Sequence, residues 1–305
     1  MSVIVFPGQG SQYHEMAMDF NKTFAFSRKI FEEIEDCTNI SIRKIICEND
    51  NNKLNQTNFT QIAIFSVSIV IYKTLIDQIG IDTIKPKIVL GHSLGEYSAL
   101  VASKVLSLSD ASNLIKIRSE LMNSAIKPNF SGMAAIIGKN AEFVTNLIKN
   151  NNLNIQIAND NSPMQVVISG LMTDIETAEK IFISKGVKRY LKLNVSAAFH
   201  SKYMIEAQNK LNDEINKITF SSTKIPIISN YNATLNTDTK KIINSLKNQM
   251  ANKVRWTESI QTLEKTQEYE VIEIGPGKVL SGLISRITKK FDIKSIDKIN
   301  DLEKF

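Results

Sequence analysis

The sequence predicts an α/β fold in which helices cover both faces of a parallel sheet and a smaller unit is inserted into the chain. Three observations lead to this prediction. Short apolar strands alternate with helical stretches in the first and last parts of the chain, which is the order expected of a parallel sheet. Two of these strands run directly into glycine-containing turns, at residues 7–10 and 91–95. Between the two parts, residues 128–195 follow a pattern of their own.

The first part, residues 1–127, contains two strand-turn-helix units. Val3–Phe6 is a β-branched and aromatic strand that meets Pro7-Gly8, and Lys87–Leu90 is an apolar strand that runs into residues 91–95. Helical periodicity marks the remaining stretches. These amphipathic helices are expected at Phe24–Asp36, at Gln61–Ile79 with Gly80 as its end, from Glu96 to about Ala102, and from near Asp110 onward.

Residues 128–195 are interpreted as an inserted subdomain that follows a linker at 127–132. Its strands and helices are expected in the order βαββαβ, which is that of the ferredoxin-like unit. The expected elements are Met133–Ile137, Ala141–Lys149, Leu153–Ala158, Gln165–Ser169, Asp174–Ser184 and Lys188–Leu193.

The first pattern resumes at Ser196, so that residues 196–305 complete the domain begun by residues 1–127. The tail beyond Lys289 shows no clear pattern. The expected elements are a helix at Lys202–Ile215, a strand at Ile225–Ser229, a helix at Thr239–Met250, a strand at Tyr269–Ile274 and a helix at Lys278–Ile287.

Composition narrows the class of protein. With 43% apolar and 22% charged residues in 305 positions, the chain is globular rather than disordered or fibrous. Cys37 and Cys47 form no CxxC pair, so we expect no metal site, no disulfide scaffold and a reducing, cytoplasmic location. We expect no targeting segment and no membrane span, since the most apolar window, Ile62–Tyr72, is short and contains serines, which indicates a buried helix. The net charge of +6 is interspersed, which argues against nucleic-acid binding and fits an acidic partner or an anionic substrate.

The strongest chemical motif is Gly91-His92-Ser93-Leu94-Gly95, which matches G-x-S-x-G between a strand and a helix. At such an elbow the serine hydroxyl stands exposed above the sheet, and the flanking glycines keep Cβ atoms out of a crowded crossing. The backbone N–H of Leu94 would point to the same place and begin an oxyanion hole. The core is therefore expected to be α/β-hydrolase-like, with Ser93 as a nucleophile.

A serine nucleophile needs a general base, and the chain has three histidines. His92 adjoins Ser93, so its side chain should point away from the hydroxyl and pack. His14 lies in the first turn region and is expected at the surface. By elimination His200 is the base. No carboxylate stands out as a third member, and a backbone carbonyl could orient the imidazole instead.

Four motifs in order carry a family resemblance: residues 6–12 (Phe-Pro-Gly-Gln-Gly-Ser-Gln), residues 91–100, Phe199-His200-Ser201 and Glu273–Gly277. Together they closely resemble bacterial malonyl-CoA:acyl carrier protein transacylase, from residue 3 to about 290 and including the insert. The resemblance implies transfer of a malonyl group from malonyl-CoA to the phosphopantetheine thiol of acyl carrier protein, for fatty acid synthesis, by a protein that binds no cofactor and no metal. A monomer is expected.

The resemblance also implies a role for each site residue. Ser93 would carry the malonyl group, His200 would activate it, and the backbone N–H groups of Gln9 and Leu94 would form the oxyanion hole. Arg118, which taken alone would be expected on a solvated helix face, would clamp the malonyl carboxylate. Further implied positions are Gln249, whose backbone carbonyl would orient the histidine; Phe199, which would favour malonyl over larger groups; and Asn159 and Asn161 near the pocket, which could equally be turn caps.

Four positions depart from the family pattern: Ile62, Ala198 and Lys253 each stand where proline is common, and Ser119 replaces a common glycine. Loop rigidity is thereby put in doubt, whereas the chemistry is not.

Three other functions remain open: a serine esterase or thioesterase, a non-catalytic binding module, and a trans-acting acyltransferase of polyketide synthesis. For the acidic carrier, the basic residues expected to ring the cleft are Lys188, Arg189, Lys202, Lys278 and Arg286.

Overall fold

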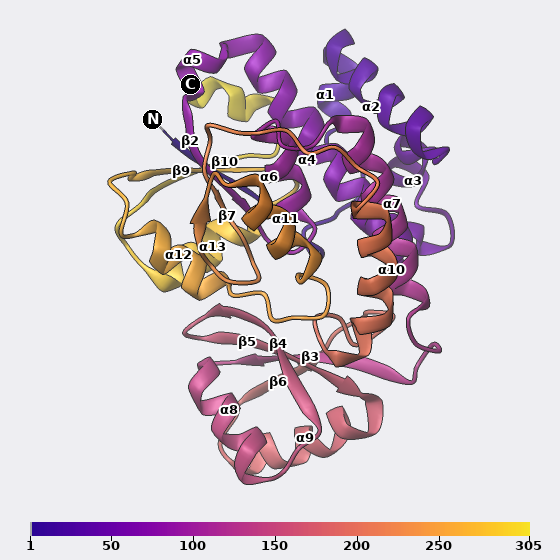
Figure 1. Ribbon diagram of the computed structural model, residues 1–305, viewed down its shortest axis with the longest axis vertical. Coiled ribbons are helices and arrows are strands. Elements are labelled where there is room, and N and C mark those ends of the chain that lie inside the picture. The colour runs from indigo at the N-terminus through magenta and orange to yellow at the C-terminus, as the bar shows by residue number, and fades with distance from the viewer. Residues whose placement is uncertain (1) are drawn as a thin grey trace.

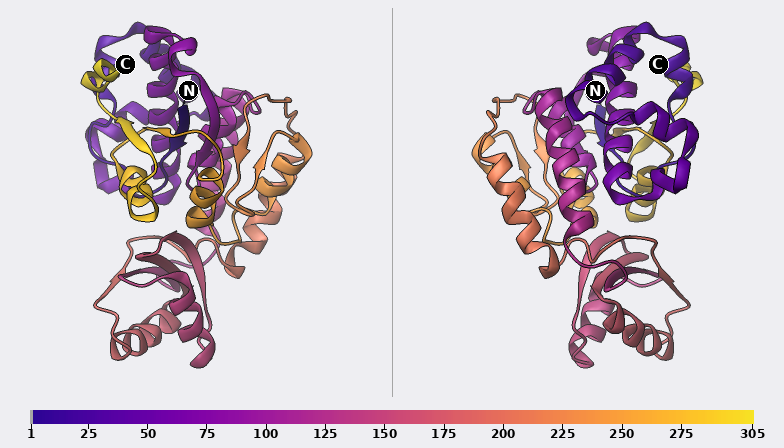
Figure 2. Two further views of the ribbon diagram at one scale, coloured as in Figure 1. Left: turned by 90° about the vertical axis from the view of Figure 1, so that its left-hand side faces the viewer. Right: turned by 90° about the vertical axis from the view of Figure 1, so that its right-hand side faces the viewer.

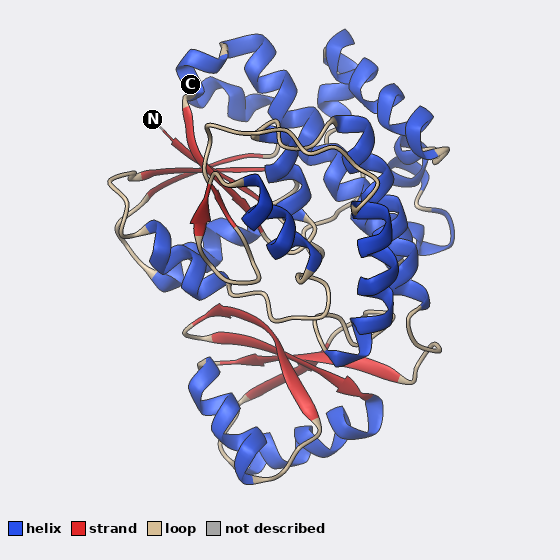
Figure 3. Cartoon of the chain, viewed as in Figure 1, coloured by secondary structure: helices blue, strands red, loops and turns tan. Residues whose placement is uncertain are grey.

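Two separate sheets organise the chain, whose residues 2–305 are described by a computed structural model. The larger sheet and most of the helices form the upper part of the molecule in Figure 1, and the smaller sheet with two helices lies below them. The side views in Figure 2 show the same division, and the colouring in Figure 3 separates the two groups of strands. The predicted α/β class with a second, inserted sheet is confirmed.

The core sheet has six strands in the order β10-β9-β1-β2-β7-β8, all parallel except the edge strand β8. Every residue of β1 is buried. Val3 and Val5 pack into one hydrophobic cluster, while Ile4 and Phe6 pack into another, as expected of a strand with helices on both sides. The strands are β1 Ser2–Phe6, β2 Pro86–Gly91, β7 Ile227–Ile228, β8 Leu235–Asn236, β9 Glu270–Ile274 and β10 Asp292–Ile296.

Helices cover the two faces of this sheet unequally. Helices α12 and α13 pack on the Val3 and Val5 face, and the larger cluster on the opposite face contains α4, α6 and α7. The helices of this domain are α1 Met18–Thr23, α2 Ala25–Thr38, α3 Ile42–Glu48, α4 Thr57–Ile79, α5 Ile81–Ile84, α6 Gly95–Ala102, α7 Leu108–Ser124, α10 Ile205–Ile215, α11 Thr239–Lys247, α12 Trp256–Leu263 and α13 Val279–Ile287, with short 3-10 turns η1 Asp50–Asn55, η2 Lys202–Met204 and η3 Ile299–Lys304.

Helix α4 lies in the centre of the larger cluster. Residues 60–72 are buried on all sides, because α2, α3, α6 and α7 surround them. The prediction of a buried helix at Ile62–Tyr72 is confirmed, and the amphipathic pattern predicted for Gln61–Ile79 is wrong over this stretch. By length and composition the helix could cross a membrane, yet 83% of its most apolar window is buried inside the protein. Such burial is typical of a core helix.

The second sheet has the antiparallel order β4-β5-β3-β6, with helices α8 and α9 packed on one face. This is the strand order of the predicted ferredoxin-like unit. Alternation along β3 assigns the faces: Ala134 and Ile136 belong to the insert's own core, whereas Met133 and Ala135 pack toward the main domain. The elements are β3 Ser131–Ile137, α8 Ala141–Asn150, β4 Ile155–Ser162, β5 Gln165–Leu171, α9 Met172–Ser184 and β6 Arg189–Lys192.

Several elements of the structure were not predicted, among them α3, α5 and β8. The tail beyond Lys289 forms β10 and η3. Helix α12 lies between Met250 and Tyr269, where the sequence pattern predicts no element. β4 continues to Ser162 rather than ending at Ala158, because residues near its end also pair with the segment before α12. Asn159 and Asn161 therefore lie on a strand, and the interpretation of them as turn caps is wrong.

Candidate functional site

Ser93 lies on a tight elbow between β2 and α6. Its φ of 52° is in the left-handed region, which costs a non-glycine residue about 1–3 kcal/mol and is typical of functional sites. A Cβ atom at Gly91 would lie 2.0 Å from the carbonyl carbon of Gly95, and one at Gly95 would lie 2.2 Å from the carbonyl oxygen of Phe6. Both glycines of the motif are thus required by the close crossing of α6 over β1 and β2.

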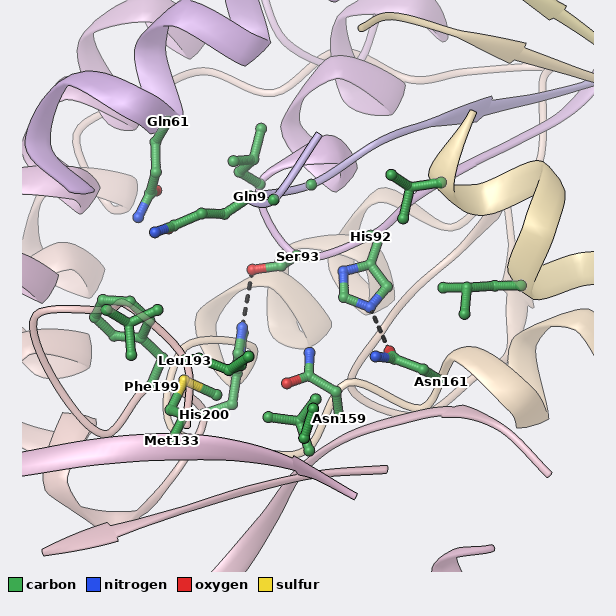
Figure 4. A pocket seen from close by; sticks show the side chains of 18 of the residues that line it. Gln9, Gln61, His92, Ser93, Met133, Asn159, Asn161, Leu193, Phe199 and His200 are labelled. Carbon is green, nitrogen blue, oxygen red and sulfur yellow. Dashed lines mark hydrogen bonds between the residues drawn. The ribbon is translucent and has the colours of Figure 1, made fainter. Parts of the chain in front are cut away.

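The hydroxyl of Ser93 is paired with the imidazole of His200 (Figure 4). Ser93 Oγ lies 2.8 Å from His200 Nε2, and His200 Nδ1 lies 3.1 Å from the backbone carbonyl oxygen of Gln249. Since a carbonyl can only accept, Nδ1 carries the proton and Nε2 is left to accept the hydroxyl proton of Ser93. A carbonyl therefore occupies the place that a carboxylate has in a Ser-His-Asp triad.

The environment of His200 keeps the ring neutral. Burial, and next the positive charge of Arg118, lower the pKa of His200 to about 3. His200 itself has a φ of 55°, and the chain around it is held by hydrogen bonds from Ser201 Oγ to the carbonyl oxygen of Ala198 (2.6 Å) and from the Ala198 N–H to Ser131 Oγ (3.0 Å). A proline at position 198 has no N–H and could not donate this second bond. In this chain, hydrogen bonds restrain the loop in place of the common proline.

The other two histidines make different contacts. His92 Nε2 lies 2.8 Å from Asn161 Oδ1, and its ring packs 5.5 Å from that of Trp256. His14 is exposed at the surface and contacts the carbonyl of Cys47. Neither histidine bonds to Ser93, as predicted.

Two backbone donors beside Ser93 are free. Within residues 2–305, the N–H groups of Gln9 and Leu94 have no hydrogen-bond acceptor. Both residues line the same cleft as Ser93. Two unpaired N–H groups next to a nucleophile can hold a negative oxygen.

Arg118 is the buried cation of the site, with a side chain only 1% exposed. It does not lie on the solvated helix face that its position alone suggested. One Nη donates to Ser93 Oγ and to Gln249 Oε1, each at 3.0 Å, and the other donates to Oε1 of Gln61. It forms no salt bridge within the described residues 2–305, and its Nε has no hydrogen-bond partner. A buried charge held only by neutral acceptors is costly, which favours an anionic ligand at this position.

The cleft in front of Ser93 has a volume of about 290 Å³ and lies between the core and the inserted sheet. The core contributes the catalytic polar groups, and the insert contributes Asn159, Asn161 and Gln165. The insert and the segment before His200 also contribute an apolar wall (Figure 4). Phe199 is part of this wall, and Asn159 and Asn161 line the cleft beside it. The apolar wall consists of Met133, Ala135, Val167, Leu193, Val195 and Phe199.

Besides Ala198, two of the four departures from the family pattern have visible compensations. Ser119 Oγ donates to the backbone carbonyls of Asn58 (3.1 Å) and Lys116 (2.8 Å), joining α7 to α4. Lys253 pairs with Glu258 at 3.1 Å. Ile62 is fully buried in α4.

Sequence reasoning missed three contributors to this site. Gln61 holds the guanidinium of Arg118, the side chain of Gln249 bridges Arg118 and the backbone of Ser93, and Asn230 contacts the elbow from behind. Gln61 is a lone amide at the start of the apolar run of α4, which is the one sequence signal that could have found it. Asn230 lies in a polar Ser-Asn-Tyr-Asn stretch and carries no such signal.

Within residues 2–305, which the structure describes, no three His, Cys, Asp or Glu side chains are grouped so that they could hold a metal ion. Cys37 and Cys47 are free thiols.

Comparison with known proteins identifies the family. The acyl transferase domain model matches residues 3–304. The chain is 38% identical over 291 residues to the polyketide biosynthesis malonyl CoA-acyl carrier protein transacylase PksC of Bacillus subtilis, covering 95% of this chain and 98% of that protein.

Solved structures give the same result. The acyl-carrier-protein-S-malonyltransferase from Bartonella henselae superposes with a TM-score of 0.94 at 35% identity, covering 100% of this chain and 98% of that one. A malonyl-transacylase solved in complex with its type II PKS acyl-carrier protein gives a TM-score of 0.93 at 32% identity, covering 99% and 97%. By its sequence, its fold and the residues around Ser93, this chain belongs to the acyl transferase domain family, among the malonyl-CoA:acyl carrier protein transacylases.

Proposed function

We propose that this enzyme transfers the malonyl group of malonyl-CoA to the phosphopantetheine thiol of acyl carrier protein through a malonyl ester on Ser93. One observation carries the proposal: Ser93 Oγ lies 2.8 Å from a neutral imidazole and 3.0 Å from the buried guanidinium of Arg118. A nucleophile beside an unpaired cation suits an acyl group that ends in a carboxylate. An esterase of neutral substrates has no use for that cation, and a binding module has no use for the nucleophile-base pair.

In the first half-reaction, Ser93 Oγ attacks the thioester carbonyl of malonyl-CoA while its proton passes to Nε2 of His200. The carbonyl oxygen becomes negative and accepts hydrogen bonds from the N–H groups of Gln9 and Leu94. The C–S bond then breaks, and the imidazolium returns its proton to the departing thiolate. CoA leaves as a thiol and malonyl-Ser93 remains.

The second half-reaction reverses these roles. The phosphopantetheine thiol gives its proton to His200 as its sulfur attacks the ester, and Ser93 recovers that proton when the C–O bond breaks. No group outside the chain is needed for either step, so the proposal includes no bound cofactor and no metal.

Arg118 would hold the malonyl carboxylate in both steps. Its two Nη groups now donate to Gln61, Gln249 and Ser93, which are neutral acceptors that a carboxylate could replace with a stronger, charge-assisted pair. The apolar wall, with Phe199 next to the base, leaves little space for a branch on the acyl group. We therefore propose malonyl as the preferred substrate.

The first test is kinetic. If a malonyl-enzyme is formed, initial rates with malonyl-CoA and holo-acyl carrier protein both varied should give parallel double-reciprocal lines. Intersecting lines would mean direct transfer within a ternary complex and would contradict the mechanism. Comparing carriers from fatty acid and polyketide pathways in this assay tells which pathway the enzyme serves; we propose fatty acid synthesis.

We further propose a cytoplasmic monomer. The two free thiols and the burial of α4 within the core support a reducing location away from a membrane. Sedimentation of the purified protein should give one species near 34.2 kDa. A species of twice that mass would show a dimer.

The rate of malonyl-enzyme formation should depend little on acidity. His200 must be neutral to act as a base, and its pKa of about 3 keeps it so throughout the ordinary range. The single-turnover rate should stay constant from about pH 8 to about pH 5, whereas a histidine with the usual pKa near 6.5 would lose about tenfold by pH 5.5. Rapid-quench measurement across this range checks the prediction, and a tenfold loss by pH 5.5 would contradict it.

Carrier binding should depend on α13 rather than on the end of the insert. None of the five basic residues expected around the cleft lines it. Lys278 precedes Val279, which lines the cleft. Arg286 donates a hydrogen bond of 3.3 Å to Gln165, another lining residue. Lys188 and Arg189 lie just before and at the start of β6, the end away from the lining residue Leu193, so they are weaker candidates for carrier docking.

Reversing the charge at Lys278 and Arg286 should therefore raise the KM for acyl carrier protein several-fold, more at low salt than at high. The matched control is the same reversal at Lys188 and Arg189, which should change it little. A larger effect in the control would place the docking surface on the insert. An equal loss with malonyl-CoA would show that α13 binds the CoA phosphates instead.

A further inference from the structure

A buried polar cluster lies behind the nucleophile elbow, on the side away from the cleft. It consists of Asn230 after β7, Glu96 in the first turn of α6 and Gln249 after α11, each 1% exposed. None of the three lines the cleft. Asn230 and Gln249 form hydrogen bonds with the backbone of the elbow, and Glu96 accepts hydrogen bonds from both of them.

Asn230 spans the elbow with its side-chain amide. Its Oδ1 accepts from the N–H of Ser93 at 2.6 Å, and its Nδ2 donates to the carbonyl oxygen of Gly91 at 2.6 Å. The chemistry fixes this orientation, because an N–H must meet the oxygen and a carbonyl must meet the nitrogen. One side chain thus ties the last residue of β2 to the nucleophile two residues later.

The Ser93 N–H needs such a partner. With Ser93 in the left-handed conformation, its N–H is outside both the ladder of β2 and the hydrogen bonds of α6, so a buried donor would otherwise be unpaired. Asn230 is itself held on both sides: its N–H donates to Glu96 Oε2 at 3.2 Å, and its carbonyl oxygen accepts from the N–H of Arg255 at 3.1 Å.

Gln249 and Glu96 restrain the other side of the elbow. Gln249 Nε2 donates to the carbonyl oxygen of Ser93 at 2.8 Å and to Glu96 Oε2 at 2.7 Å. The peptide groups on both sides of the Ser93 Cα are therefore fixed by side chains that never touch the cleft.

We propose that Asn230 is a positioning residue for the reaction: it clamps the strained elbow so that Ser93 Oγ is directed at His200 Nε2 and the neighbouring N–H of Leu94 faces the reacting carbonyl. This inference rests on the proposed role of Ser93. Asn230 touches neither substrate nor base, so its removal should slow the chemistry while leaving substrate binding nearly unchanged.

The test compares Asn230→Ala, Asn230→Asp and the control Asn232→Ala in single-turnover formation of malonyl-enzyme. Asn232 lies in the same turn, but its partners are Ser245 and Thr234 rather than the elbow. Asn230→Ala should lower the maximal rate about 100-fold, the size of effect that small misplacement of a reacting group produces. The malonyl-CoA concentration for half-maximal rate should stay within about threefold.

Asn230→Asp is nearly isosteric and guards against a folding defect in the alanine variant. It keeps an acceptor for the Ser93 N–H but sets an oxygen against the Gly91 carbonyl, so its rate should also fall at least tenfold. Melting curves confirm that each variant is folded at the assay temperature.

Three results would overturn the proposal. They are a maximal rate for Asn230→Ala within threefold of the parent, an equal loss of rate in Asn232→Ala, or a rise in the half-saturating malonyl-CoA concentration with no change in the maximal rate. Failure of the proposed function looks different. In that case the parent itself would form no malonyl-enzyme, or Ser93→Ala would still form it.

Discussion

Replacing His200 by alanine should slow both half-reactions by about 10²–10⁴-fold, the usual contribution of a general acid-base group. The same imidazole takes a proton from Ser93 in one step and from the carrier thiol in the other, so neither step should escape. Single-turnover rates of malonyl-enzyme formation and of malonyl transfer to holo-acyl carrier protein measure the two effects separately.

The matched control is His14→Ala, since His14 is exposed and contacts the carbonyl of Cys47 rather than Ser93. It should leave both rates unchanged. If His200→Ala slowed only one half-reaction, a different group would serve as base in the other, and the single-base mechanism would fail.

Replacing Arg118 by alanine should remove malonyl transfer and raise activity with acetyl-CoA relative to malonyl-CoA. A malonyl carboxylate bound without its cation would be buried and unpaired, a loss of about 3–5 kcal/mol or roughly 100- to 4,000-fold. An acetyl group has no carboxylate to leave unpaired. Values of kcat/KM for both substrates measure the change in preference.

Arg118→Lys gives the matched comparison. It keeps the charge but loses the planar fork that donates to a carboxylate at two points, so it should fall between the parent and the alanine variant. An alanine variant that kept the parent's preference for malonyl would show that Arg118 does not bind the carboxylate.

The elements that short-range sterics decide could be predicted from the sequence. Gly91 and Gly95 identified the elbow because a Cβ at either position would collide with backbone. The βαββαβ insert followed from the order of its strand and helix stretches, and the structure then shows that Ala134 and Ile136 face its own helices while Met133 and Ala135 face the main domain. His200 emerged by elimination because the chain has so few histidines.

Long-range contacts decided the rest. The burial of Arg118 and its bonds to Gln61 and Gln249 depend on how α7 packs against α4 and the loop after α11, which no local pattern reveals. β10 was missed because it is an edge strand with mixed polarity, stabilised by pairing with β9. Helix α12, by contrast, carried a usable signal in the spacing of Trp256, Ile260 and Leu263, all of which are buried.

Asn230 illustrates the limit most clearly. It is one asparagine in a chain rich in them, two residues after a two-residue strand. Only the folded arrangement brings it within 2.6 Å of both ends of the elbow, 137 and 139 residues away along the chain.

The central claim is that Ser93 carries the malonyl group, and mass spectrometry of the enzyme after brief exposure to malonyl-CoA tests it most directly. The intact parent should gain the mass of one malonyl group, the modified peptide should contain Ser93, and adding holo-acyl carrier protein should remove the group and transfer it to the carrier. Ser93→Ala should gain nothing while keeping the melting temperature of a folded protein. A malonyl group on any other residue of the parent, or one retained by Ser93→Ala, would contradict the account.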